Sequence, residues 1–190
     1  MQTNHSWDGA TRGLHWGLAL LITFQLFGGL LVSAPNTLVY FYIHEFVGLF
    51  AAVVVLFTWL WGYANDDMPL LFPWGGEGRA EVMKEVKELL KGELPKVGRR
   101  RGLSSFVHGL GLLAVTGMSA TGVLIFFVIP GGHGASASST HYGAFTELAV
   151  MHRSLANLVW AYWFGHVGFA VLHQLKGNNV FAAIFGSGVK

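Results

Sequence analysis

Four apolar runs, each long enough to cross a lipid bilayer, dominate this sequence of 190 residues. They cover about residues 14–33, 40–63, 104–129 and 148–174, and a helix needs about 20 residues to span the hydrocarbon layer. The only charged residues inside the runs are Glu45 and Arg153, each near one end. Because only helices and closed barrels satisfy their backbone hydrogen bonds in lipid, the runs predict an all-α integral membrane four-helix bundle. We expect one domain over residues 1–190.

Basic residues gather in one loop. Of the twelve Lys and Arg residues, those between the second and third runs are Arg79, Lys84, Lys87, Lys91, Lys96, Arg99, Arg100 and Arg101. The segments "SAPNTLV" and "GGHGASASSTHYGAFTE", after the first and third runs, contain no Lys or Arg. Because cytoplasmic loops carry the excess of Lys and Arg, we expect the central loop and both termini to be cytoplasmic. On the same reasoning "GRRRG" is an orientation signal, and no nucleic acid is expected as a partner.

The central loop contains one segment with helical periodicity, "GRAEVMKEVKELLKGELP". Its apolar residues recur on one helical face, with Lys and Glu on the opposite face; they are Val82, Val86, Leu89 and Leu90. This pattern predicts a cytoplasmic amphipathic helix that ends near Gly92 and Pro95. Three roles are open for it: a helix on the membrane surface, a solvated connector, or a docking surface for a partner.

The histidines of the apolar runs are arranged in depth. Those in or at the ends of the runs are His15, His44, His108, His152, His166 and His173. At about 100° per residue the last three share one face of the fourth helix, and His152 and His166 lie about 21 Å apart along it. His44 and His152 share the outer level, whereas His15, His108 and His166 lie toward the inner level. Because ionisable side chains in a membrane are rare and usually functional, this pattern indicates ligands at two levels.

Imidazole is a good ligand for iron, copper and zinc. The chain has no cysteine, which excludes iron–sulfur clusters and covalently attached c-type haem. Few acidic residues accompany the histidines, so a hard-cation site or a hydrolytic zinc site lacks its other ligands. The pattern favours two bis-histidine b-type haems, stacked along the membrane normal about 20 Å apart.

Haem also needs flat space beside its ligands, and the chain contains 26 glycines. Those next to, or one turn from, candidate ligands are Gly48, Gly109, Gly111 and Gly165. A glycine there can admit a porphyrin, and close packing between helices is the alternative explanation. Arg12, one turn before His15, and Arg153, next to His152, are candidate anchors for haem propionates. For both arginines, ordinary snorkelling to the membrane interface is the alternative.

Three features of the sequence together resemble the bacterial cytochrome b561 superfamily. They are Arg12-x-x-His15-Trp16 at the first run, His44 at the start of the second, and "HRSLANL" followed by "GH" in the fourth. That superfamily includes the di-haem cytochrome b subunits of nickel–iron hydrogenases, formate dehydrogenases and thiosulfate reductases. It also includes the small superoxide:ubiquinone oxidoreductase. The resemblance covers all four runs.

The resemblance implies a role for each candidate residue. It makes His15 and His166 axial ligands of the inner haem, and His44 and His152 axial ligands of the outer haem. It implies a quinone site near the inner haem, in the vicinity of Arg12, His108 and His173. It also implies a multi-pass protein of the bacterial cytoplasmic membrane. The long inner loop resembles the hydrogenase-type subunits more than the shortest members of the superfamily. The scarcity of charge near the outer loops leaves the outer partner open.

The predicted function is electron transfer through two b-type haems between a periplasmic redox protein or dehydrogenase subunit and the membrane quinone pool. Lipid and quinone are the expected partners, and a homodimer is compatible with this interpretation. One rival is a superoxide oxidase that reduces ubiquinone, which would favour a basic outer funnel, where this chain offers Arg153, His133 and His141. The other rivals are a metal transporter without a haem spectrum and a haem-free anchor subunit.

Overall fold

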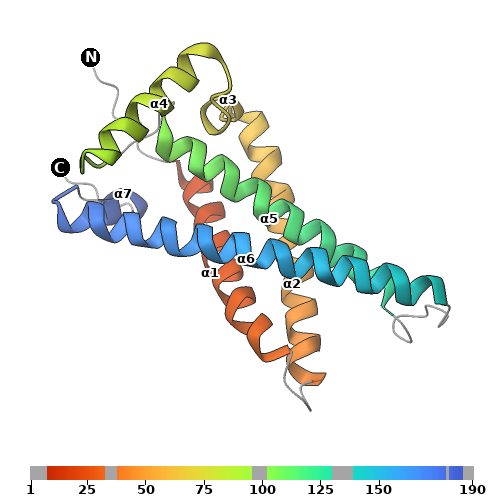
Figure 1. The fold of residues 1–190 in the computed structure, drawn as a ribbon. Helices are drawn as coiled ribbons and strands as arrows, with labels where there is room; N and C mark the ends of the chain where they lie inside the picture. The colour runs from red at the N-terminus through yellow and green to blue at the C-terminus, as the bar shows by residue number, and fades with distance from the viewer. Residues whose placement is uncertain (1–7, 33–37, 96–101, 130–138, 179, 186–190) are drawn as a thin grey trace. The chain divides into compact units, whose positions relative to one another are not determined.

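A computed structural model of the chain describes residues 8–32, 38–95, 102–129, 139–178 and 180–185. Within these ranges the regular elements are α1 (Gly9–Val32), α2 (Leu38–Ala64), α3 (Met68–Leu71), α4 (Gly76–Leu90), α5 (Leu103–Val128), α6 (Ser139–Leu175) and α7 (Val180–Phe185). Figure 1 follows them from red at α1 to blue at α7. Residues 33–37 of the first predicted turn, the arginines of "GRRRG" and His133 lie outside the described residues.

Among the described residues, four helices are long and apolar enough to cross a membrane: α1, α2, α5 and the part of α6 over Gly143–Leu175. They confirm the four predicted spans and the all-α membrane fold, although α1 and α6 begin earlier than the apolar runs. Large apolar side chains on these helices point outward, among them Phe46, which is 76% exposed, and Phe164. Such a surface would be an aggregation liability in water, whereas lipid solvates it. The chain is therefore a multi-pass membrane protein.

The first span begins at a side-chain cap. Asp8 Oδ1 accepts a hydrogen bond from the Thr11 amide at 2.8 Å, and Asp8 Oδ2 accepts one from the Thr11 hydroxyl at 2.6 Å. An aspartate that bonds the third amide of a helix satisfies one of the donors left unpaired by the helix start. The hydroxyl and amide bonds from Thr11 hold the pKa of the Asp8 carboxyl below its ordinary value.

The chain divides into two compact units, and each unit takes a part of every span. One unit, called here the His44 unit, contains residues 14–32, 38–57, 113–129 and 139–162. The other, called the α4 unit, contains residues 8–13, 58–95, 102–112, 163–178 and 180–185.

Small residues bring the helices of the His44 unit together. A Cβ added at Gly17 of α1 would lie 3.5 Å from Val54 Cγ1 of α2. A Cβ at Gly117 of α5 would lie 3.3 Å from Leu155 Cδ1 of α6. The buried apolar side chains of this unit are Leu26, Ala51, Val55, Val115 and Val159. Close approach at small residues is how helices associate in lipid, where burial of apolar surface supplies no driving force.

In the α4 unit the chain turns sharply after α2. Asp66 has a positive φ of 55°, and the Asp67 amide bonds the Gly62 carbonyl at 2.9 Å, which closes the helix end. The short helix α3 then packs on α5, where a Cβ added at Gly109 would collide with the Leu71 carbonyl oxygen. Gly109, which the sequence suggested as haem space, therefore serves helix packing instead.

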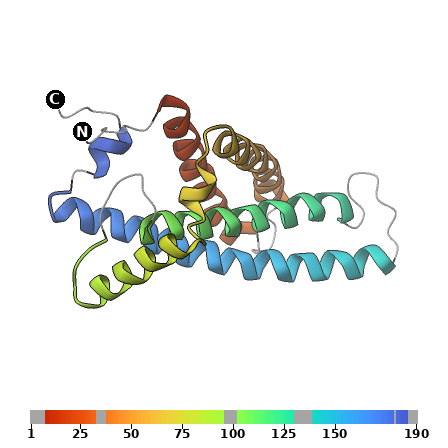
Figure 2. The same cartoon turned by 90° about the horizontal axis from the view of Figure 1, so that it is seen from above.

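Helix α4 is the predicted amphipathic helix, and Figure 2 shows it beside the first turns of α5. It ends at Leu90, and Gly92 follows with a φ of 86°. The Gly92 amide bonds the Leu89 carbonyl and the Glu93 amide bonds the Glu88 carbonyl. This pair of bonds around a left-handed glycine is a Schellman motif, which explains why the helix ends where the sequence placed its end.

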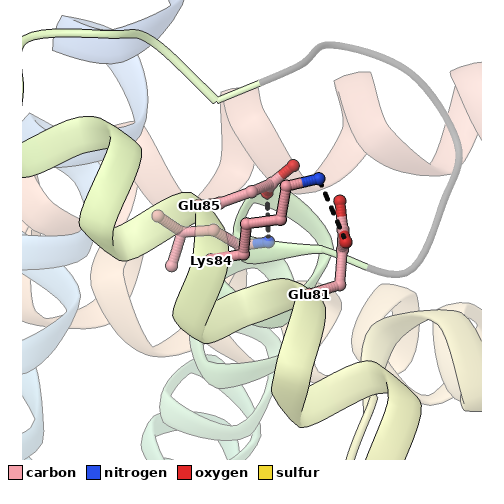
Figure 3. A network of polar contacts seen from close by, with 4 residues as sticks. Glu81, Lys84 and Glu85 are labelled. Carbon is pink, nitrogen blue, oxygen red and sulfur yellow. Dashed lines mark hydrogen bonds and ion pairs between the residues drawn. The ribbon is translucent and has the colours of Figure 1, made fainter.

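One feature of α4 differs from the amphipathic pattern. All of its glutamates were expected on the polar face, but Glu85 is only 1% exposed. Its Oε2 accepts a hydrogen bond of 2.7 Å from the amide of Leu103, the first residue of α5, as Figure 3 shows. The carboxylate thus binds a free amide at a helix start, where the helix dipole favours negative charge. Glu81 on the same helix instead faces Lys84, at 3.8 Å.

Candidate functional site

Two imidazoles meet in the His44 unit, one from α2 and one from α6. The ring centroids of His44 and His152 are 6.4 Å apart, and the ring planes are nearly perpendicular, at 87°. A bond from a metal to an imidazole nitrogen is about 2 Å long, so two imidazoles on opposite sides of one metal place their centroids about 6 Å apart. The separation of His44 and His152 suits two axial ligands of one iron.

Glycines border both rings of this pair. A Cβ added at Gly29 of α1 would lie 3.4 Å from His44 Cε1. A Cβ added at Gly122 of α5 would lie 3.3 Å from His152 Cε1. A side chain at Gly122 would crowd the His152 ring, and one at Gly29 would touch the His44 ring. Helix α1 therefore packs closely on the His44 ring, and α5 packs closely on the His152 ring.

Gln25 ties the His44 segment to α1. It is buried, and its Nε2 donates a hydrogen bond of 2.7 Å to the carbonyl oxygen of His44. A Cβ added at Gly48 would lie 2.6 Å from that same Nε2. Gly48 therefore makes room for the Gln25 amide, which differs from the porphyrin contact suggested by the sequence.

The two imidazoles have different hydrogen-bond environments. His152 Nδ1 lies 2.8 Å from Thr121 Oγ1. His44 Nδ1 is buried and, among the described residues, has no hydrogen-bond partner. Among the described residues, therefore, no hydrogen bond at Nδ1 sets the orientation of the His44 ring.

A second pair of imidazoles lies in the α4 unit. The centroids of His108 on α5 and His166 on α6 are 4.8 Å apart, with an angle of 89° between the rings. This distance is too short for a metal between the two rings, so they contact each other edge to face. His108 Nδ1 lies 2.7 Å from the Ser104 carbonyl oxygen. Because a carbonyl oxygen only accepts, Nδ1 carries the proton of neutral His108, and Nε2 carries the lone pair.

The other candidate residues, His15, Arg12 and Arg153, lie on α1 and α6. His15 is on α1 in the His44 unit, edge-on to Trp16. His166 belongs to the other unit, so the pairing of His15 with His166 stays a prediction. Arg12 precedes His15 on α1, and Arg153 is exposed on α6.

The end of α6 holds His173. It is 8% exposed, and its Nδ1 accepts a hydrogen bond of 3.2 Å from the Asn178 amide group. The Asn178 backbone amide also bonds the His173 carbonyl, and Gly177 has a φ of 83°. Gly165, which the sequence suggested as haem space, is exposed, and a Cβ added there would meet no atom within 4 Å.

Sequence reasoning missed three polar residues around the histidines: Gln25, Ser104 and Thr121. Gln25 carries a usable signal, because an amide inside an apolar run must find a buried partner. Thr121 carries none, since several Ser and Thr residues of α5 look alike in the sequence. Ser104 contributes its backbone carbonyl, which no residue type encodes.

The fold and these residues define an all-helical, multi-pass membrane protein with paired imidazoles inside its spans. The family model described as prokaryotic cytochrome b561 matches residues 6–187. The chain therefore belongs to the prokaryotic cytochrome b561 family, whose members transfer electrons across membranes with b-type haem. No curated protein and no solved structure matched the chain.

Proposed function

We propose that the protein transfers electrons across a bacterial cytoplasmic membrane through two b-type haems, between a periplasmic redox partner and the quinone pool. The observation that carries the proposal is the His44–His152 pair, with centroids 6.4 Å apart and a glycine against each ring. The donor set fits haem, because two neutral imidazoles with no cysteine nearby are typical of b-type centres. When bound, a bis-histidine haem stores and passes on one electron at a potential set by its surroundings.

In this proposal each histidine has a stated task. His44 and His152 hold the iron of the outer haem, and Arg153 binds its propionates. His15 and His166 hold the iron of the inner haem, and Arg12 binds its propionates.

His108 is the proposed contact of the quinone, and His173 on α6 is a second residue proposed for that site. The Ser104 carbonyl fixes the proton of neutral His108 on Nδ1, so Nε2 can accept a proton from a quinol hydroxyl. After protonation, the same Nε2 can return that proton to a quinone oxygen. Contact between His108 and His166 supports a quinone site beside the inner haem.

The surface of α4 supports a cytoplasmic central loop. Its exposed residues include Arg79, Lys84, Lys87 and Lys91, together with the apolar Met83 and Leu90. Because Glu85 bonds the first amide of a membrane span, α4 is held at the end of that span. A basic face with apolar residues suits the anionic cytoplasmic leaflet.

Replacing His108 with phenylalanine tests the quinone site. We expect the His108→Phe protein to keep both haem spectra, because the substitution removes no proposed iron ligand. Reduction of the haems by quinol is expected to slow at least about tenfold, which corresponds to about 1.4 kcal/mol of lost transition-state stabilisation. Stopped-flow absorbance at the haem bands measures both quantities.

Ser104→Ala is the matched control, since it preserves the backbone carbonyl that bonds His108 and should leave the rate unchanged. Normal quinol kinetics in His108→Phe would remove His108 from the quinone site. Loss of a haem would instead make His108 an iron ligand. Haem reduction by superoxide alone, without a partner protein, would identify the superoxide:quinone activity in place of the conduit.

A further inference from the structure

Thr121 holds one of the two paired imidazoles through a buried hydroxyl. Its side chain is 5% exposed, and its Oγ1 lies 2.9 Å from the carbonyl oxygens of both Gly117 and Met118. The same Oγ1 lies 2.8 Å from His152 Nδ1. A hydroxyl has a single proton, and carbonyl oxygens only accept. The hydroxyl therefore donates toward the two carbonyls and accepts a hydrogen bond from His152 Nδ1–H.

We propose that Thr121 is a positioning residue that fixes the proton of His152 on Nδ1, presents Nε2 to the metal, and lowers the reduction potential of the haem bound there. This inference rests on the proposed function, because it requires His152 to be an iron ligand. Thr121 itself does not touch the iron.

The chemistry follows from the two nitrogens of imidazole. In the neutral ring one nitrogen carries the proton and the other the lone pair. The hydrogen bond made at one nitrogen therefore decides which nitrogen is left to bind a metal, and it also fixes the orientation of the ring. An acceptor at Nδ1–H also makes the ring a more basic ligand. A more basic ligand stabilises the oxidised iron more than the reduced iron, so the potential falls.

The two histidines of this pair differ in the hydrogen bond at Nδ1. His44 Nδ1 is buried without a hydrogen-bond partner among the described residues, and Gly29 lies against its ring. The His44 ring is therefore oriented by packing, whereas the His152 ring is oriented by a hydrogen bond. Removing the Thr121 hydroxyl should therefore lower the basicity of the His152 imidazole and leave that of His44 unchanged.

Redox titration of purified Thr121→Val and Thr121→Ser tests the proposal. Valine keeps the shape of threonine without the hydroxyl, and serine keeps the hydroxyl. We expect Thr121→Val to raise the midpoint potential of the His44–His152 haem by up to a tenfold change in its one-electron equilibrium constant, which is about 59 mV. The other haem should keep its potential, and Thr121→Ser should remain at the wild-type value. Thr116→Val, on the same helix, is the control and should shift neither haem.

The outcomes separate this inference from the proposed function. If Thr121→Val leaves both potentials unchanged while His152→Ala loses a haem, the role of Thr121 is overturned and the ligand assignment stands. If His152→Ala keeps both haems, the ligand assignment itself fails. Loss of one haem in Thr121→Val but not in Thr121→Ser supports the proposal. Loss of that haem in both variants contradicts it, since the hydroxyl would then not be the deciding group.

Discussion

Alanine at either His44 or His152 is expected to abolish the same haem signal and to leave the other haem in place. The two rings come from different helices, α2 and α6, yet their centroids are 6.4 Å apart. If both rings bind one iron, as proposed, alanine at either position leaves that iron with one protein ligand. Haem content should fall to about half, because one of the two proposed bis-histidine sites is lost.

Redox-titrated difference spectra of purified His44→Ala and His152→Ala measure this result. Both variants should lack the same spectral component, with the same midpoint potential. Ser154→Ala is the matched control, since Ser154 is exposed on α6 close to His152 and its hydroxyl bonds the Val150 carbonyl. Loss of different components in the two histidine variants would show that His44 and His152 do not serve one iron.

Glu85→Ala is expected to loosen the junction between α4 and α5. The substitution removes a buried carboxylate and leaves the Leu103 amide without the partner that it has at 2.7 Å. An unsatisfied buried donor costs about 1–3 kcal/mol, and the carboxylate also interacts favourably with the helix dipole. Hydrogen exchange at the start of α5 should accelerate about tenfold for each 1.4 kcal/mol lost.

Hydrogen-exchange mass spectrometry in detergent or nanodiscs measures that change. Glu81→Ala is the control on the same helix, because Glu81 faces Lys84 at 3.8 Å in a partly exposed ion pair. Pairs of this kind contribute about 0–1 kcal/mol, so exchange at α5 should stay near the wild-type rate. Glu85→Gln, which keeps an acceptor oxygen, should lie between the two. Equal exchange in Glu85→Ala and Glu81→Ala would contradict the capping role.

The helices of this protein could be predicted from the sequence, because a membrane span needs a long run of apolar residues and an amphipathic helix needs a periodic one. Both signals are summed over many residues and do not depend on any single contact. Four long apolar runs gave four spans, and one periodic segment gave α4. The end of α4 could be predicted as well, since a glycine such as Gly92 adopts the left-handed backbone conformation without steric cost. The burial of Glu85 could not be predicted, because its hydrogen-bond partner, the amide of Leu103, belongs to the next helix and is separated from α4 by a loop.

The histidines were recognised as ligand candidates, but their second contacts were not. An imidazole in a membrane span stands out by its polarity, whereas the threonine that bonds it resembles many others. The approach of His108 to His166 depends on how α5 and α6 pack, which spacing along one helix cannot reveal. The contact of Gly48 with Gln25 could not be predicted for the same reason, since Gln25 lies on a different helix.

Haem quantitation tests the central claim most directly. The full-length protein, expressed with haem available and purified in mild detergent, should give a pyridine haemochrome spectrum of b-type haem. The ratio should be about two haems per chain, one for each pair of axial histidines. A protein that binds one haem, or none, under these conditions would contradict the account of two haem levels in the membrane.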